Sequence, residues 1–107
     1  MALDLQTRDA GGWLVIAVRG EVDLNSSPQL RKAVLSGIER TSRVAVDLSN
    51  AEYMDSSGVA TMVEALKAAS ERKKKFALLS PSSAVTRVLE LARLHSLFDI
   101  RANLEEA

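Results

Sequence analysis

Three short, mostly apolar runs alternate with stretches of helical periodicity, and this alternation is the strongest constraint on the fold. The runs lie at residues 13–18, 43–48 and 76–79. A continuous apolar run of this length is typical of a strand that is covered on both faces. Between the runs, apolar residues of 30–38 and 59–69 recur every three or four positions, as on the buried face of a helix. Strands that alternate with helices predict a mainly parallel sheet with right-handed crossovers.

The two ends of the chain extend this pattern. Residues 3–8 alternate apolar and polar side chains, and a glycine turn joins them to the next strand, which predicts an antiparallel edge hairpin. A third helix is expected after the polar residues 80–83, then a short strand at 97–100 and a frayed helix at 101–107. We therefore expect one α/β domain over residues 1–107. Its sheet should be mixed, mostly parallel and four- to five-stranded, with an N-terminal antiparallel edge strand and helices packed against it.

Composition argues against several classes of function. Lys plus Arg and Asp plus Glu each number 14, so the chain lacks the basic excess of a nucleic-acid-binding protein. It has no cysteine, and its single histidine, His95, is placed near the end of the third helix without catalytic neighbours, so no metal site and no cofactor is predicted. The absence of a run of about 18 apolar residues and of a secretory signal predicts a cytoplasmic protein without membrane insertion.

The turn formed by Asp55, Ser56, Ser57 and Gly58 separates a central strand from the following helix. Its first three residues can each cap that helix through a side-chain oxygen, which is the ordinary role of such residues. A serine phosphate there, with a charge of about −1.5 to −2, would lie at the favourable end of the helix dipole and leave the fold intact. Beside Asp55, on a surface docked against a partner, the same charge would repel that partner. The turn therefore predicts a phosphorylation-controlled binding site.

Two enzyme-like chemistries fit this turn poorly. A hydrolase nucleophile elbow requires glycine two residues before Ser56, where the chain has Met54. A phospho-aspartate receiver would use Asp55 at a strand end and a Mg²⁺ held by further carboxylates, which Asp23 alone supplies poorly. No catalytic residue is therefore predicted, and the chain is expected to be a binding protein rather than an enzyme.

Residues 46–58 closely resemble the signature of STAS-domain anti-sigma factor antagonists, a family of bacterial transcription regulators. The resemblance continues in residues 20–23, which match the family's Gly-Glu-hydrophobic-Asp turn, and in residues 88–91 and 97–100. It therefore covers nearly the whole chain. Each match is weak alone, but four in the right order and spacing are fairly specific.

The resemblance implies a mechanism. The phosphoacceptor is Ser56, with Ser57 as second choice, and the kinase is a partner that is both an anti-sigma factor and an ATP-using serine kinase. The unphosphorylated form binds this partner and so frees a sigma factor, phosphorylation abolishes binding, and a phosphatase resets the cycle. We expect a monomer or weak dimer that makes no direct contact with nucleic acid. The partner-binding residues are expected to be Asp23, Asn25, Met54, Asp55, Ser56, Ser57 and Gly58, with burial beneath the turn as the open alternative for Met54.

Two positions depart from the family pattern. Residues 58–60 read Gly-Val-Ala where Gly-Leu-Gly is usual, which is a conservative change. After the third helix many switch members have a Thr-Gly-like break, whereas residues 92–95 read Ala-Arg-Leu-His and are expected to extend the helix. STAS domains also serve as accessory subunits of membrane lipid-transport ABC complexes and as parts of other signalling assemblies. That role stays open as the alternative function.

Overall fold

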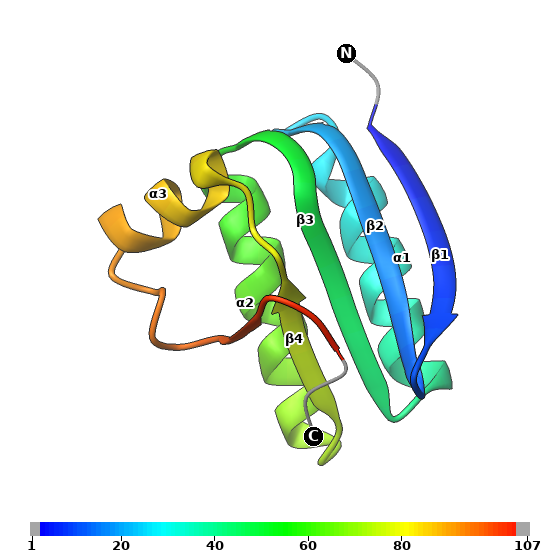
Figure 1. The fold of residues 1–107 in the computed structure, drawn as a ribbon. Coiled ribbons are helices and arrows are strands. Elements are labelled where there is room, and N and C mark those ends of the chain that lie inside the picture. The colour runs from blue at the N-terminus through cyan, green and yellow to red at the C-terminus, as the bar shows by residue number, and fades with distance from the viewer. Residues whose placement is uncertain (1–2, 105–107) are drawn as a thin grey trace.

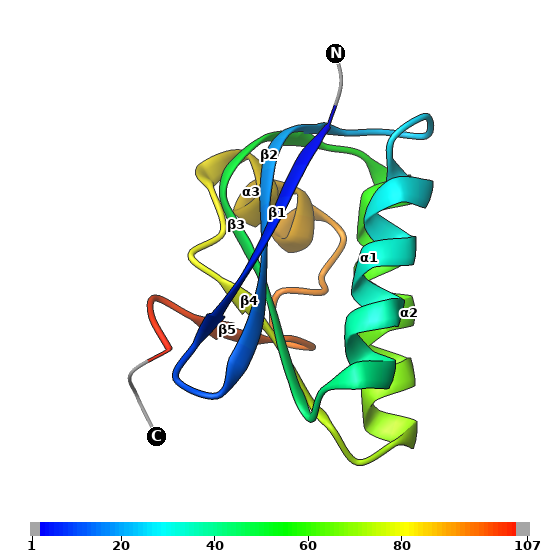
Figure 2. The ribbon, with the colours of Figure 1, turned by 90° about the vertical axis from the view of Figure 1, so that its right-hand side faces the viewer.

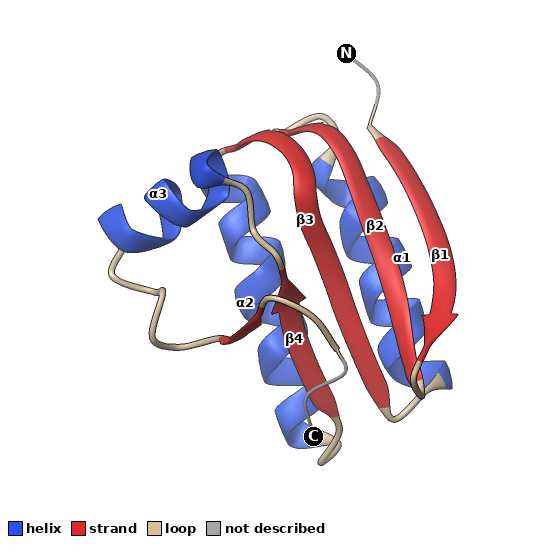
Figure 3. Cartoon of the chain, in the orientation of Figure 1, coloured by secondary structure: helices blue, strands red, loops and turns tan. Residues whose placement is uncertain are grey.

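Strands and helices alternate along the chain in the predicted order. The computed structural model describes residues 3–104. The elements are β1 (Asp4–Ala10), β2 (Trp13–Val22), α1 (Ser27–Arg40), β3 (Arg43–Met54), α2 (Ser56–Glu71), β4 (Lys75–Leu79), α3 (Ser83–Leu91) and β5 (Asp99–Arg101). The strands form one sheet in the order β1-β2-β3-β4-β5, in which β1 is antiparallel to β2 and all other pairs are parallel (Figures 1 and 3). The predicted α/β class, the mixed sheet and the antiparallel edge strand are confirmed.

A tight two-residue turn closes the hairpin of β1 and β2. Its residues, Gly11 and Gly12, have φ angles of 57° and 85°. Positive φ at both central positions defines a type I′ turn, whose twist matches that of the flanking strands. Glycine adopts this backbone without steric cost. The register runs from Ala10 opposite Trp13 at the turn to Asp4 opposite Arg19 at the far end.

Helices α1 and α2 cover one face of the sheet and form the main core with it (Figure 2). Gly37 allows α1 to lie close to the sheet, because a Cβ at this position would stand 2.9 Å from Leu14 Cδ2. The helices contribute fully buried side chains at helical spacing, and burial of each Val, Leu, Ile or Met among them stabilises the fold by roughly 1.5–3 kcal/mol relative to exposure. These are Leu30, Val34 and Ile38 of α1, and Met62, Ala65 and Ala69 of α2. Within residues 3–104, no helix has both the length and the apolar character needed to cross a membrane.

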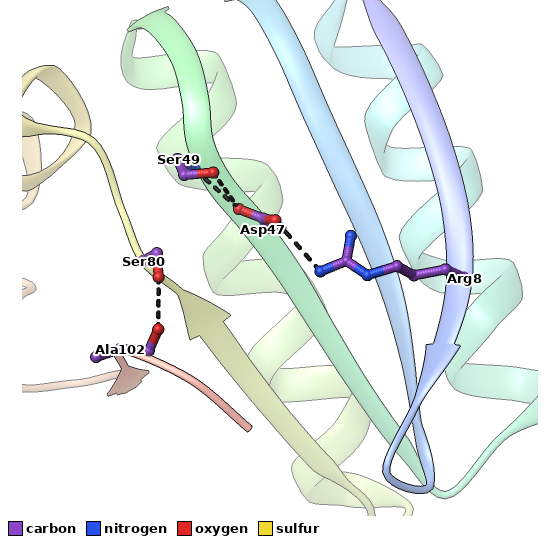
Figure 4. Close-up of polar contacts among 5 residues, drawn as sticks. All are labelled: Arg8, Asp47, Ser49, Ser80 and Ala102. Atoms are coloured by element: carbon purple, nitrogen blue, oxygen red, sulfur yellow. Dashed lines mark hydrogen bonds and ion pairs between the residues drawn. The ribbon is translucent and has the colours of Figure 1, made fainter. Parts of the chain in front are cut away.

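The opposite face of the sheet carries a smaller apolar cluster around Trp13. The guanidinium carbons of Arg101 and Arg43 lie 5.0 and 6.0 Å from the centroid of the indole ring, within the range of cation–π attraction. Ser80 holds the C-terminal segment against this face through two hydrogen bonds. Its N–H donates to Arg101 O over 2.7 Å. Its hydroxyl donates to Ala102 O, also over 2.7 Å (Figure 4).

The rest of this face is polar and open to solvent. The Arg8 guanidinium of β1 lies 3.6 Å from Asp47 Oδ2 of β3 (Figure 4). The same carboxylate accepts hydrogen bonds at Oδ1 from the N–H and the hydroxyl of Ser49. The sheet therefore presents its charged groups on the face that the helices leave uncovered.

Strand β3 is longer than predicted. The sequence pattern ended it at residue 48, but it continues to Met54 and pairs with β2 throughout, across two register shifts. Because β4 has only five residues, α3 packs along the last part of β3 instead. Ser82 joins the two, since its N–H donates to Leu48 O over 3.1 Å and its hydroxyl to Ala51 O over 2.7 Å.

Helix α3 ends at Leu91, so the prediction that residues 92–95 extend it was wrong. Arg93 takes up a left-handed backbone with φ of 60°. Its N–H donates to Glu90 O and the N–H of Leu94 donates to Leu89 O, which together are the two bonds of a Schellman motif. His95 consequently lies beyond the helix, exposed in a loop. Residues 102–104 are not helical, contrary to the predicted terminal helix, whose last three residues lie outside the described part of the chain.

Candidate functional site

Asp55, one of the three turn residues expected to be able to cap α2, is its N-cap residue. It follows β3 directly, with extended φ and ψ of −99° and −171°. Its Oδ1 atom accepts hydrogen bonds from the N–H of Ser57 at 2.9 Å, the N–H of Gly58 at 3.4 Å and the hydroxyl of Ser57 at 2.6 Å. One carboxylate oxygen therefore satisfies two of the backbone donors that a helix start leaves without partners.

These bonds stabilise the charged form of the carboxylate. The hydroxyl of Ser57 is the largest influence that holds the pKa of Asp55 below its ordinary value. Partial burial opposes this effect, and the N–H groups of Ser57, Gly58 and Leu24 reinforce it. Because Leu24 belongs to the turn after β2, Asp55 links the two turns predicted to form the site. Its own N–H also donates to Val22 O over 3.0 Å.

The two serines differ in what their hydroxyl groups do. Ser56 is the first residue of α2 and is exposed, and its hydroxyl makes no hydrogen bond within residues 3–104. Ser57 is half-buried, and its hydroxyl donates to Asp55. Its carbonyl oxygen accepts from the hydroxyl of Thr61 over 3.1 Å. Of the two hydroxyl groups, that of Ser56 can therefore be approached from solvent without breaking the helix cap.

Gly58 is buried where the start of α2 meets the ends of β2 and β3. A Cβ at this position would lie 2.6 Å from Met54 Cγ and 2.7 Å from Val22 Cγ1, distances that packed atoms do not tolerate. Met54 is itself 1% exposed, so its side chain lies beneath the turn rather than on the partner-facing surface. Its neighbour Tyr53 is 49% exposed. Gly58 thus serves close packing, and the exposed part of the turn is Ser56 with Tyr53 before it.

Asp23 organises the second turn. Its Oδ1 accepts from the N–H of Asn25 and the N–H of Ser26, each over 3.0 Å, and from the hydroxyl of Ser26. The N-cap of α1 is Ser26, whose side chain makes no capping bond to the helix. Its hydroxyl instead accepts from the N–H of Asp23 over 2.9 Å and donates to Glu21 O over 2.8 Å, so Asp23 and Ser26 hold the turn together. Asn25 is exposed, and so is Leu24, at 75%. The turn is therefore rigid and presents a leucine to solvent.

An apolar groove begins at Ser56. It has a volume of about 330 Å³ and is lined by Ser56, Val59, Val88, Leu91 and Ala92. Leu91 is 77% exposed although it belongs to α3. Sequence reasoning missed both Leu91 and Leu24. Neither leucine belongs to the regular pattern of buried apolar positions around it. A large apolar residue outside that pattern is the feature of the sequence that could have indicated an exposed contact residue.

The comparisons with known proteins agree with this architecture. The family model described as STAS domain matches residues 4–107. An anti-sigma-B factor antagonist of Staphylococcus aureus is 30% identical over 107 residues, which cover 98% of both chains. An anti-sigma factor antagonist of Mycobacterium paratuberculosis has a similar fold, with a TM-score of 0.87 at 22% identity over 98% of this chain and 90% of that one. The Bacillus cell fate determinant SpoIIAA in its phosphorylated form gives a TM-score of 0.72 at 23% identity, over 98% of this chain and 95% of that one.

Proposed function

The chain belongs to the STAS domain family of anti-sigma factor antagonists, and we propose that it is a partner switch controlled by phosphorylation of Ser56. In its unphosphorylated form it binds an anti-sigma factor that is also a serine kinase, and a sigma factor is released. Phosphate transfer to Ser56 then makes the complex dissociate. In this role the chain binds and is modified, while the partner supplies ATP and the catalytic groups.

The hydroxyl of Ser56 is the observation that carries this proposal. It is exposed and has no hydrogen-bond partner in residues 3–104, whereas the hydroxyl of Ser57 is held by Asp55 at 2.6 Å. A kinase must align the attacking hydroxyl with the phosphate of ATP, and a hydroxyl without a competing bond is free to align. Phosphorylation of Ser57 would instead remove a bond of the helix cap. The contrast supports Ser56 as the acceptor.

The position of Ser56 also supports a change in binding without a change in fold. A phosphate on the first residue of α2 lies at the positive end of the helix dipole, which favours negative charge. Its charge would nevertheless lie beside the Asp55 carboxylate and at the rim of the apolar groove. A partner that covers the groove would have to desolvate this charge without neutralising it, which strongly disfavours binding.

The partner surface extends from Ser56 in two directions. On one side, the groove can accept an apolar side chain of the kinase between Val59 and Leu91. On the other, the rigid turn around Asp23 presents Leu24. Because Ser56 itself lines the groove, a kinase that reaches its hydroxyl necessarily covers the groove as well. Buried apolar anchors of this kind dominate the energetics of most protein interfaces.

The test uses the anti-sigma factor kinases encoded in the genome that carries this chain. The purified chain is incubated with each kinase and ATP, and the phosphorylated residue is located by mass spectrometry. The Ser56→Ala variant should accept no phosphate, while Ser57→Ala should still accept it. In calorimetric titrations, Ser56→Asp should bind the kinase at least about a hundredfold more weakly than the unmodified chain, on the scale of a central interface residue.

Three outcomes would count against the switch. A Ser56→Asp variant that binds its kinase normally would contradict it, and so would transfer of phosphate to Ser57 alone. Stable binding to a transporter ATPase with no phosphate transfer by any kinase would favour the accessory role instead. Leu91→Ser and Leu24→Ser should weaken kinase binding while leaving the thermal midpoint of unfolding unchanged, since both side chains are exposed.

A further inference from the structure

The outer edge of β1 is an unpaired strand edge. β1 is first in the strand order, and within residues 3–104 no other strand pairs with the side that faces away from β2. The strand has seven residues and contains no proline, so its free N–H and C=O groups can template a further strand. Native proteins protect such edges or use them for association.

The hairpin determines which backbone groups face this edge. A type I′ turn closes on a hydrogen-bonded pair, here Ala10 and Trp13. Hydrogen-bonded and non-bonded pairs alternate along an antiparallel ladder. The even-numbered residues of β1 therefore direct their N–H and C=O groups toward β2, and Leu5, Thr7 and Asp9 direct theirs outward. A second β1 strand can pair only in a register that places odd residues opposite odd residues.

Charge selects among these registers. A two-fold axis at Arg8 would place Arg8 opposite its own copy. A two-fold axis at Thr7 would place Arg8 opposite Gln6 of the second copy. An axis at Leu5 would place Asp4 opposite Gln6. An axis at Gln6 places Asp4 opposite Arg8 twice, once on each side of the axis. Only this register pairs opposite charges, and it does so at non-bonded positions, where facing side chains come closest.

We propose that β1 pairs antiparallel with β1 of a second copy, with Asp4 opposite the second copy's Arg8. Both side chains are exposed. They lie on the open face of the sheet, because the odd-numbered Leu3 and Leu5 pack into the helical core and successive residues of a strand point to opposite faces. Asp4 has no ion pair within residues 3–104. Arg8 lies at 3.6 Å from Asp47 and has further guanidinium donors for a second carboxylate (Figure 4).

The dimer would be a continuous ten-stranded sheet with all helices on one face. Its axis is perpendicular to the sheet, so the two copies run in opposite directions and their Ser56 sites lie at opposite ends. Both sites stay open, because β1 is separated from β3 and α2 by the whole of β2. Strand pairing alone buries little surface, so the association should be weak, with a dissociation constant on the order of 10 to 100 μM.

Charge reversal tests the register directly. In sedimentation equilibrium at low salt, Asp4→Arg and Arg8→Asp should each raise the dimer dissociation constant by roughly tenfold or more, because each places like charges opposite each other. An equimolar mixture of the two variants should form a heterodimer at least as readily as the wild type forms its homodimer, since every facing pair is then complementary. A mixture that stays as dissociated as its components would overturn the proposal.

A cysteine placed on the axis provides a second test that does not depend on charge. The chain has no cysteine, so Gln6→Cys introduces a single thiol, and the proposed axis brings it opposite its own copy at a Cα separation of about 4.5 Å, within disulfide range. Mild oxidation should crosslink this variant. The matched control Asp9→Cys, three residues along the same strand and also exposed, should form no disulfide-linked dimer, because the proposed axis does not bring residue 9 opposite its own copy.

The backbone pattern gives a third test. Thr7→Pro removes an N–H that faces outward and is not used by β2, so it should abolish dimerisation and leave the circular dichroism spectrum unchanged. A wild-type chain that is monomeric at about 1 mM contradicts the proposal whatever the other variants do. An Asp9→Cys variant that crosslinks as well as Gln6→Cys contradicts it too.

Discussion

The hydroxyl of Ser57 donates a 2.6 Å hydrogen bond to Asp55, two residues earlier in the chain. This bond gives adjacent serines different roles, because it ties Ser57 to the helix cap and leaves Ser56 exposed. It also places the capping carboxylate directly before the residue proposed to be phosphorylated. The proposed switch and the cap of α2 therefore depend on neighbouring residues. Their effects on partner binding and on stability can be distinguished only by comparing matched variants.

The first prediction concerns the cap itself. Asp55→Ala should lower the free energy of unfolding by about 1 kcal/mol, within the 0.5–2 kcal/mol typical of a lost N-cap. Asp55→Asn should lower it by less, since asparagine also caps helices well. Urea denaturation followed by circular dichroism measures both. Ser56→Ala is the control and should change stability by less than about 0.5 kcal/mol, because its hydroxyl has no partner to lose in the described part of the chain.

A second prediction concerns acid. The pKa of Asp55 is lowered in the folded state, chiefly by the Ser57 hydroxyl, so the folded state favours the charged carboxylate. The resulting stability is fully present above the unfolded-state pKa of about 3.9 and is lost as the pH falls through the lower folded value. Urea midpoints of the wild type and Asp55→Asn should therefore differ most near neutral pH and converge as the pH falls through the lowered folded-state pKa. A difference that is constant with pH would show that the charge of Asp55 contributes nothing.

A third prediction compares negative charge at the two serines. Ser56→Asp should leave stability unchanged or raise it by up to about 1 kcal/mol, since the charge meets the positive end of the α2 dipole. Ser57→Asp should lower stability by roughly 1–3 kcal/mol, because it replaces a donor to Asp55 with a second carboxylate. Thermal unfolding of the two variants side by side is the measurement. Equal destabilisation by both would contradict the division of roles between the serines.

A fourth prediction concerns Gly58. Gly58→Ala should destabilise the fold by about 1–3 kcal/mol, because its methyl group would overlap with Met54 and the stiff side chain of Val22. Ala60→Ser, an exposed change two residues further along α2, is the matched control and should be close to neutral. If Gly58→Ala were as stable as the wild type, glycine at this position would have to be explained by the partner's approach rather than by internal packing.

The fold was predictable because its strands and helices have strong, regular patterns of apolar residues. A capping turn before α2 was visible as well, although the pattern left open which of residues 55–57 caps the helix. The last part of β3 was not, because Glu52 and Tyr53 interrupt the alternation that ends at the buried Met54. Its strand character depends on β2 and α3 on either side, and contacts between distant segments are invisible in a local pattern.

The end of α3 escaped prediction for a different reason. Helices that close with a left-handed residue usually place glycine or asparagine there, and here the residue is Arg93. The two backbone hydrogen bonds that close the helix around Arg93 are seen only in the structure, because the sequence has no residue there that is typical of such an end. Leu91 and Ala92 at this helix end line the groove beside Ser56, so the wrong helix end concealed part of the candidate site.

Trp13 has a practical consequence for all of these measurements. It is the chain's single tryptophan and begins β2, while the turn held by Asp23 and Asp55 follows the other end of that strand, roughly 30 Å away. Its indole is 3% exposed and lies beneath Arg101 of the C-terminal segment. The emission of Trp13 will thus change when the sheet unfolds or when that segment detaches. It will not change when a partner binds at Ser56. Fluorescence of Trp13 therefore reports on folding alone, and partner binding at Ser56 has to be followed with a separate fluorescent label.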